Sequence, residues 1–249
     1  MRKILFIVLV KILIGISLIS IFFIFKNKEE DYVQKKVFEE VINISNKSND
    51  KEKEEEGSKI IKEVVNIKEL YKVNNDIIGW IKIENTNINY PVMQTKENPN
   101  YYLKRNFYNQ YSDYGTPYLS EYCNIKTSDN LIIYAHNMNG KKMFGELENY
   151  KMKTYYDNHQ IINFYTMQEN EKYEIISVFK TIAYTGFEYY KFYYAKDKRE
   201  FDTFVNKCKE LSFFDTGKTA KYGDKLITLS TCENSNKDGR LVVVARKIM

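Results

Sequence analysis

The sequence predicts a mainly β domain, a barrel or a sandwich, behind one long apolar segment and a charged linker. The chain of 249 residues contains 22 tyrosines and 15 phenylalanines, and together with frequent β-branched residues they suit a β-rich core. From residue 75 onward, short apolar runs are separated by polar loops. Because these runs do not alternate regularly with helical patterns, they favour a barrel or sandwich over a doubly wound sheet.

The apolar segment is "ILFIVLVKILIGISLISIFFIF", residues 4–25, after a short tail at residues 1–3. A helix of this length spans a hydrocarbon core of roughly 30 Å at about 1.5 Å per residue. Lys11 interrupts the run, but its long stem can carry the ammonium to the nearer interface. The alternative is a cleaved signal peptide, yet the run exceeds a typical signal core and no Ala-x-Ala-like site follows it. We expect an uncleaved membrane anchor, whose orientation the flanking charges do not decide.

Residues 26–59 predict a charged stalk between the anchor and the main domain. Val33, Val37, Val41 and Ile44 have helical spacing. The stretch "SNKSNDKEKEEEGS" then predicts a solvated break. Helical periodicity resumes in "IIKEVVNIKELYKV", where we begin the main domain, residues 60–249.

The main domain contains seven or eight predicted strands and a few helices. Two strands flank the turn-prone "ENTN" in "DIIGWIKIENTNINYPVMQ", and a short one is expected at residues 116–120. The later strands are "NLIIYAHN", "QIINFYT", "EKYEIISVFKTIAY", "DKLITLSTC" and "RLVVVARKI". "GELENYKMKTYYDNH" predicts a short helix. In "DKREFDTFVNKCKEL" a longer helix places five residues on one side: Phe201, Phe204, Val205, Cys208 and Leu211.

Charge and cysteine content exclude several classes of function. The formal net charge is +5, and lysines are interleaved with acids, which indicates a solvated surface and no nucleic-acid partner. No Cys-x-x-Cys or His-x-x-x-His spacing occurs, so we expect no metal site and no cofactor. The three cysteines are Cys123, Cys208 and Cys232. An odd number leaves at least one thiol unpaired, and a bridge between the first two is compatible with the sequence but not required.

Cys232 lies at the tip of a strand, in "LITLSTCEN". A structural cysteine is more comfortable in the middle of a strand, whereas a reactive thiol needs a rigid support and open space in front. The polar loop "ENSNKDG" joins this strand to "RLVVVARKI". If the two strands pair antiparallel, Cys232 faces Arg240 across about 4.5–5.5 Å. A guanidinium beside the thiol favours the thiolate, but it cannot transfer a proton.

Of the two histidines, His136 is the better candidate for proton transfer. It ends the buried strand "LIIYAH" and precedes the loop "NMNG", the placement of a working imidazole. A buried, hydrogen-bonded structural histidine remains the alternative for this position. His159 lies among polar residues at the start of a strand, and we expect a capping or surface role for it.

These residues together resemble the sortases of Gram-positive bacteria, in particular their class B subgroup. The resemblance rests on "TLSTCE" with Arg240 eight residues after Cys232, and on "YAHN" upstream. It extends over roughly residues 60–247 through "NNDIIGWIKIENTNINYPVMQ", "NYYLKRNF", "YAHNMNGKKMFGEL" and "YYDNHQIINFYT". It implies an eight-stranded sortase-type β-barrel with N-terminal helices and a few peripheral helices, preceded by one transmembrane helix.

The resemblance also implies a site and a reaction. Cys232, His136 and Arg240 would form the catalytic set. The tetrahedral oxyanion of such a reaction needs preorganised donors, for which Arg240 and a backbone N–H near Glu233 are the candidates. The enzyme would cleave a C-terminal sorting signal, often of Asn-Pro-x-Thr type, after its threonine. An amine of the peptidoglycan stem or cross-bridge would release the acyl group. The enzyme would then be a single-pass membrane protein with its domain on the cell-wall side. The residues that match the substrate groove are Ser230, Glu233, Thr185, Tyr189, Asn100 and Leu103.

Two other functions stay open at this point. The first is a membrane-anchored cysteine endopeptidase that passes its acyl group to water. The sequence hardly separates it from a transpeptidase, although product analysis with an added amine does. The second is a catalytically silent binding module that uses the aromatic-rich loops at residues 100–122, and it predicts no thiol-dependent turnover.

Overall fold

The computed structural model describes residues 2–46 and 65–248, which fall into two compact units, Met1–Glu40 and Val41–Met249. Helix α1 (Arg2–Asn46) contains the whole apolar run and continues through residues 26–46. The predicted helical spacing of the stalk is therefore confirmed. Within the described residues, α1 is the one helix long and apolar enough to cross a membrane. Most of the predicted break and the start of "IIKEVV" lie outside the described residues.

The second unit begins within the last turns of α1. Val41 is fully buried there, and the Ser45 hydroxyl accepts a hydrogen bond from the backbone N–H of Asn66 at 2.8 Å. Asn66 also caps helix α2 (Ile67–Val73) by accepting from the Glu69 N–H at 3.3 Å, which satisfies one donor of the first helical turn. Ile67 and Leu70 of α2 are buried, and the helix packs against the first strand.

Eight strands form a closed barrel, as expected, in the order β1-β2-β3-β4-β9-β10-β8-β7. Neighbouring pairs are antiparallel except β2 with β3 and β4 with β9, which are parallel. The strand bounds are β1 (Ile77–Lys82), β2 (Asn89–Met93), β3 (Tyr118–Leu119), β4 (Asn130–Tyr134), β7 (Ile161–Tyr165), β8 (Asn170–Ile182), β9 (Leu226–Cys232) and β10 (Gly239–Lys247). Closure gives each barrel strand a neighbour on both sides, which protects the sheet from pairing with other chains.

The predicted strands are present in the structure because their apolar side chains are buried in the barrel core. In β9, the first six residues are buried and Cys232 is exposed. Trp80 of β1 is buried, and its indole N–H donates to the Asn89 side chain of β2 at 2.6 Å. A buried indole needs such a partner. The core therefore supports the strand whose tip carries the thiol.

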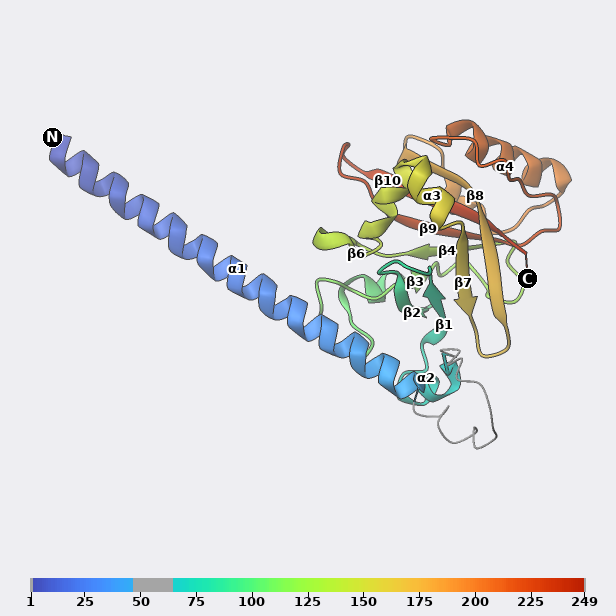
Figure 1. Cartoon of the computed structure of the whole chain (residues 1–249), viewed down its shortest axis with the longest axis horizontal. Helices are drawn as coiled ribbons and strands as arrows, with labels where there is room; N and C mark the ends of the chain where they lie inside the picture. The colour runs from blue at the N-terminus through green and yellow to red at the C-terminus, as the bar shows by residue number, and fades with distance from the viewer. Residues whose placement is uncertain (1, 47–64, 249) are drawn as a thin grey trace. The chain divides into compact units, whose positions relative to one another are not determined.

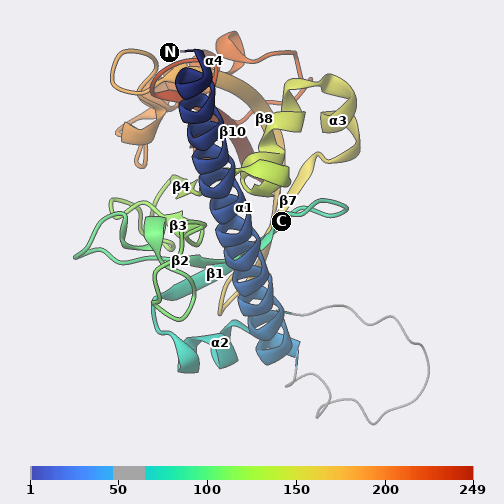
Figure 2. The ribbon, with the colours of Figure 1, turned by 90° about the vertical axis from the view of Figure 1, so that its left-hand side faces the viewer.

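Helices lie at both ends of the barrel, with α2 beside β1 and α4 (Lys198–Leu211) along β8 (Figures 1 and 2). Asp197 caps α4 by accepting from the Glu200 N–H at 2.8 Å. The apolar side predicted for this helix is buried except for Leu211, which is half-buried. Phe204 stacks on Phe192 with ring centroids 3.9 Å apart.

The segment after His136 differs in part from the sequence prediction. The predicted loop "NMNG" contains β5 (Asn137–Met138), which pairs with β6 (Lys142–Met143) in a small separate hairpin. Strands of two residues leave no periodicity to detect. The predicted short helix is present as a 3₁₀ helix (Gly145–Lys151) followed by α3 (Lys153–Asn158).

Candidate active site

Three adjacent strand tips bring the candidate catalytic residues together. Strands β4 and β9 run parallel with Tyr134 opposite Ser230, so His136 and Cys232, each two residues further along, reach the same level. In the antiparallel pair of β9 and β10, Arg240 lies directly opposite Cys232, as the hairpin predicted. Neighbouring strands are about 4.8 Å apart. The thiol therefore lies between the imidazole strand and the guanidinium strand.

Hydrogen bonds beyond the end of β4 hold this alignment. The Ala135 N–H donates to the Ser230 carbonyl at 3.2 Å, and the Thr231 hydroxyl donates back to the Ala135 carbonyl at 2.8 Å. The Asn137 side-chain amide donates to the Cys232 carbonyl at 2.9 Å. Residues on both sides of His136 are thus tied to the strand that carries the thiol.

The environment of His136 fixes its tautomer. Its Nε2 lies 2.8 Å from the Leu103 carbonyl oxygen; a carbonyl can only accept, so Nε2 carries the hydrogen and Nδ1 is the basic atom. Burial lowers the pKa of His136 below its ordinary value, and nearby Lys104 adds to this; the Leu103 hydrogen bond and Asp113 only partly oppose it. The imidazole is therefore neutral at neutral pH and able to accept a proton.

A glycine allows the Leu103 carbonyl to approach. Gly115 has a φ of +61°, and a Cβ at this position would lie 2.5 Å from the Leu103 oxygen and 2.6 Å from the Tyr102 oxygen. Only glycine combines this backbone conformation with this clearance. The loop at Gly115 thereby supports the acceptor that orients His136.

Cys232 is the one cysteine suited to be a nucleophile. All three cysteines are free; Cys232 is exposed, whereas Cys123 and Cys208 are buried. Burial raises the pKa of the Cys123 thiol to about 11 and also raises that of Cys208, so both remain protonated and inert. Within the described part of the chain, no cluster of three or more His, Cys, Asp or Glu side chains is placed to hold a metal ion.

Arg240 is held at the foot of the tight β9–β10 turn. Its Nη1 donates to the Gly239 carbonyl at 2.9 Å. The same carbonyl accepts from the Glu233 backbone N–H at 2.9 Å, so this N–H is engaged in the turn, and the expectation of an oxyanion donor from a backbone N–H near Glu233 stays a prediction. The guanidinium has five N–H donors, and one is engaged in this bond. Arg240 is thus the better candidate donor.

A groove of about 460 Å³ includes all three candidate catalytic residues. Four of the predicted substrate residues also line it: Asn100, Leu103, Tyr189 and Ser230. The hydroxyls of Tyr189 and Ser230 are both buried and lie 2.6 Å apart. Burial raises the pKa of Tyr189 to about 12, so its hydroxyl stays protonated and can act as a donor.

The other two predicted substrate residues, Glu233 and Thr185, are not among those that line the groove. Glu233 is buried and accepts from Lys151 at 2.7 Å and from the Ser235 hydroxyl at 2.5 Å. Burial raises its pKa, but these hydrogen bonds outweigh burial and lower it to about 2. Thr185 is exposed in the turn after β8.

Apart from Tyr189, sequence reasoning did not single out the tyrosines of the groove. Tyr118, Tyr122, Tyr134, Tyr184 and Tyr190 all line it. The Tyr118 hydroxyl donates to the Asn100 side chain at 2.8 Å, and Asn100 has a φ of 60°. The aromatic-rich loops at residues 100–122 were a visible signal, but the pattern of tyrosines in a loop does not say which of them face a groove.

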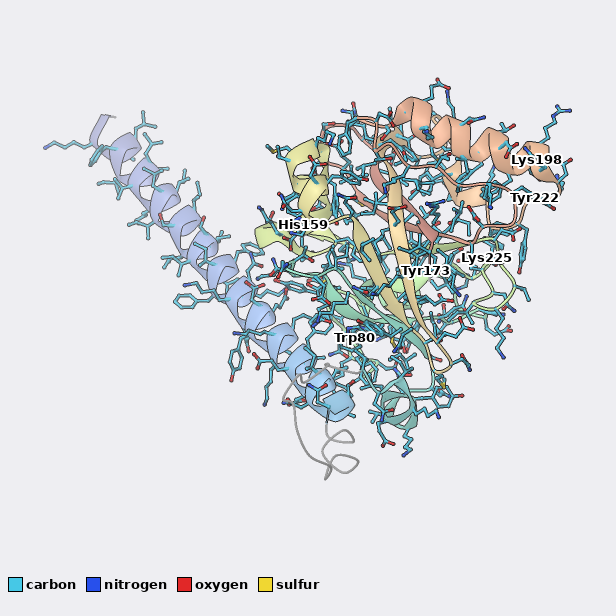
Figure 3. All side chains as sticks on the ribbon, turned by 45° about the vertical axis from the view of Figure 1, so that its right-hand side comes forward. Trp80, His159, Tyr173, Lys198, Tyr222 and Lys225 are labelled. Carbon is cyan, nitrogen blue, oxygen red and sulfur yellow. The ribbon has the colours of Figure 1, made fainter. Side chains whose placement is uncertain are left out.

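His159 has the structural role that its position predicted. It follows the last residue of α3, where its Nδ1 donates to the Tyr155 carbonyl at 2.8 Å. Its ring stacks on Tyr155 with centroids 4.1 Å apart. Figure 3 shows His159 beside this helix. It is not among the residues that line the groove.

Comparison with known proteins places this architecture in a family. The sortase domain model matches residues 81–248. Sortase B of Staphylococcus aureus is 31% identical over 182 residues, which is 72% of this chain and 73% of the relative. Sortase B of Listeria monocytogenes is 31% identical over 190 residues, or 73% and 74%.

Solved structures agree with this assignment. A Staphylococcus aureus sortase B–substrate complex is similar with a TM-score of 0.74 and 27% identity, covering 90% of this chain and 98% of that one. A sortase barrel, a strand-tip cysteine and sequence similarity over most of the chain therefore coincide. We conclude that this chain belongs to the sortase family, as a sortase B-like cysteine transpeptidase of the kind that anchors proteins to the cell wall.

Proposed function

We propose that this enzyme cleaves a C-terminal sorting signal of Asn-Pro-x-Thr type after its threonine and transfers the protein to a peptidoglycan amine. The observation that carries the proposal is the register of β4, β9 and β10, which aligns His136, Cys232 and Arg240 along one groove. A nucleophile, a proton carrier and an oxyanion donor are the groups that acyl transfer needs.

In the first half-reaction, the Cys232 thiol gives its proton to Nδ1 of His136 and its sulfur attacks the threonine carbonyl. The tetrahedral oxyanion is stabilised by Arg240, and loss of one such donor typically costs about 3–4 kcal/mol. The threonine C–N bond then breaks, and His136 returns the proton to the leaving amine. A thioester between Cys232 and threonine remains.

In the second half-reaction, a peptidoglycan amine attacks the thioester. A new C–N bond forms, the C–S bond breaks, and His136 carries a proton from the amine to the sulfur. The neutral state of His136, which its burial favours, suits this acceptance of a proton. A solvent-facing Cys232 suits access by a second substrate.

We place the enzyme at the cell membrane, anchored by residues 4–25, with the barrel on the cell-wall side. The apolar side chains of this part of α1 are exposed to their surroundings, which is costly in water and favourable in lipid. Substrates with C-terminal sorting signals and the amine acceptor are both available on that side.

Product analysis tests the transfer step against hydrolysis. The full chain in detergent is mixed with an Asn-Pro-x-Thr peptide, with and without an added peptide amine, and the products are identified by mass. We expect an amide product that grows with amine concentration at the expense of the acid. Release of acid alone, unaffected by any amine, would favour the endopeptidase.

A further inference from the structure

Among the described residues, Glu121 is the one carboxylate that lines the active-site groove, and Arg240 is the one lysine or arginine there. Within the described part of the chain, no ion pair or hydrogen bond engages the Glu121 carboxylate. A nearby acid, Glu233, differs because Lys151 and Ser235 satisfy it. A half-buried carboxylate in a substrate groove without a partner is a candidate binding group for a cation.

The backbone around Glu121 is held firmly. Ser120 donates its N–H to the Ile132 carbonyl of β4 at 2.8 Å. The Gln94 side-chain amide donates to the carbonyls of Ser120 and Cys123, both at 2.8 Å. Glu121 is thus presented to the groove from a fixed turn, which limits the backbone entropy lost on binding.

Two exposed tyrosine rings line the groove together with this carboxylate. Tyr122 is 61% exposed and Tyr184 is 75% exposed, and both line the groove with Glu121. Tyr122 stacks on Tyr193 at 5.5 Å, which fixes the plane of its ring. Aromatic faces beside a carboxylate attract lysine and arginine side chains.

The negative charge of Glu121 acts on two tyrosines that line the groove, Tyr118 and Tyr134. Burial raises the pKa of the Tyr118 hydroxyl, and Glu121 and Cys232 both raise it further while Arg240 lowers it. The pKa of Tyr134 is also raised, mainly by burial and to a smaller extent by Glu121. Glu121 and Arg240 therefore give the groove a negative and a positive group that both act on Tyr118.

The barrel register sets the separation between Glu121 and the thiol. Ser120 pairs with Ile132, which lies opposite Thr228, four residues before Cys232 in β9. At about 3.3 Å per residue and about 4.8 Å per strand, the backbones of Ser120 and Cys232 are about 16 Å apart, and Glu121 is one residue further from Cys232. An extended peptide covers most of this distance in about four residues, and a long lysine or arginine side chain covers the rest.

We propose that Glu121 binds a lysine or arginine side chain of the sorting signal, at the residue directly before Asn-Pro-x-Thr. This inference rests on the proposed function, because it uses the threonine as the acyl residue. His136 must reach the leaving amine and lies at the strand tips, so the residues after threonine leave over the barrel end. The residues before threonine run back along the groove toward Glu121, where the fourth of them, directly before Asn-Pro-x-Thr, reaches the carboxylate with its side chain.

The test compares three peptides that carry Lys, Gln or Glu directly before Asn-Pro-x-Thr, with the full chain in detergent. We expect kcat/KM for the Lys peptide to exceed that for the Gln peptide about fivefold, the effect of an ion pair of about 1 kcal/mol. Glu121→Gln should level the two rates, and Glu121→Lys should favour the Glu peptide. Glu97→Gln is the matched control, since Glu97 is exposed and outside the groove lining.

Equal rates for the three peptides with the wild-type enzyme would overturn the inference while the proposed function stands. A preference for the Lys peptide that persists in Glu121→Gln would also overturn it. So would a preference for Lys that appears only in peptides with Lys placed after the threonine. If the wild-type enzyme cleaves none of the peptides, the proposed function fails. The inference is then decided by fluorescence anisotropy with the Cys232→Ala protein, where tighter binding of the Lys peptide must disappear in Glu121→Gln.

Discussion

His136 combines a defined tautomer with a lowered pKa, and both arise from its burial against Leu103. Its folded-state pKa lies below the ordinary value of about 6.5, so the unfolded chain binds the proton more readily. Stability therefore falls as the pH drops below about 6.5. The neutral, proton-accepting imidazole persists to lower pH than that of a free histidine.

This state of His136 predicts the acid side of the pH–rate profile. We expect the acid limb of kcat/KM, which reports on the free enzyme, to have its midpoint below a pH of about 6.5, the ordinary pKa of histidine. Steady-state rates of peptide cleavage, measured from acidic to neutral pH, locate this midpoint. A midpoint clearly above that value would contradict the assignment of a buried, neutral His136 as the base.

Arg240 predicts a different signature, because its role depends on geometry more than on charge. If it binds the oxyanion or the substrate backbone through its planar fork, lysine cannot replace it. We expect Arg240→Lys to lower kcat/KM at least about tenfold, or about 1.4 kcal/mol of transition-state stabilisation. The thiol pKa, measured by the pH dependence of alkylation, should change much less. A lysine variant with near wild-type turnover, or one whose loss is fully matched by a raised thiol pKa, would refute this role.

Loops far from the thiol in sequence position the catalytic elements. Gly115 lets the 102–104 segment approach, and Leu103 then orients the histidine at the end of β4. The Asn137 amide connects the same strand end to Cys232. Substitutions of Gly115 and Asn137, which are not among the residues that line the groove, should therefore affect the chemistry without touching substrate.

We expect Gly115→Ala to lower kcat more than a simple loss of stability explains. The added Cβ meets the Leu103 carbonyl at 2.5 Å, so the acceptor for His136 must move, and the positive φ adds about 1–2 kcal/mol of strain. We expect a drop in kcat of about tenfold or more, because small misplacements of a catalytic group are costly.

Gly217→Ala is the control for Gly115→Ala. Gly217 has a similar φ of +68°, and no described atom lies within 4 Å of the position that an alanine methyl would take, so this variant carries the backbone strain alone. Thermal unfolding and peptide turnover are measured for both variants. Equal turnover per folded molecule in the two variants would argue against a positioning role for Gly115.

Several elements followed directly from the sequence because their signals are local. The apolar runs of β9 and β10 and the polar turn between them predicted the pairing of Cys232 with Arg240. The longer strands have clear patterns, whereas β5 and β6 have two residues each and none. The anchor for His136 could not be predicted, because Leu103 and Gly115 come from distant loops that meet only in the folded barrel.

At the scale of the whole molecule, the closed barrel explains why so few residues suffice for the site. Parallel pairing of β4 with β9 joins segments about a hundred residues apart in sequence, and the antiparallel β9–β10 hairpin adds Arg240. The substrate groove depends on the same closure, but the orientation of single side chains near it depends on other long-range contacts. Glu233 was predicted to face substrate, yet its pairing with Lys151, another long-range contact, directs it elsewhere.

The central claim is that these strand tips form one thioacyl-transfer site with Cys232 as its nucleophile. Intact-mass spectrometry of the full chain in detergent, mixed with an Asn-Pro-x-Thr peptide in the absence of amine, tests it most directly. We predict an acyl adduct that maps to Cys232, is removed by hydroxylamine, and is absent in Cys232→Ala. Its formation should slow about 10²–10⁴-fold in His136→Ala and little in His159→Ala. An adduct that survives in Cys232→Ala, or the reverse ranking of the two histidine variants, would contradict the claim.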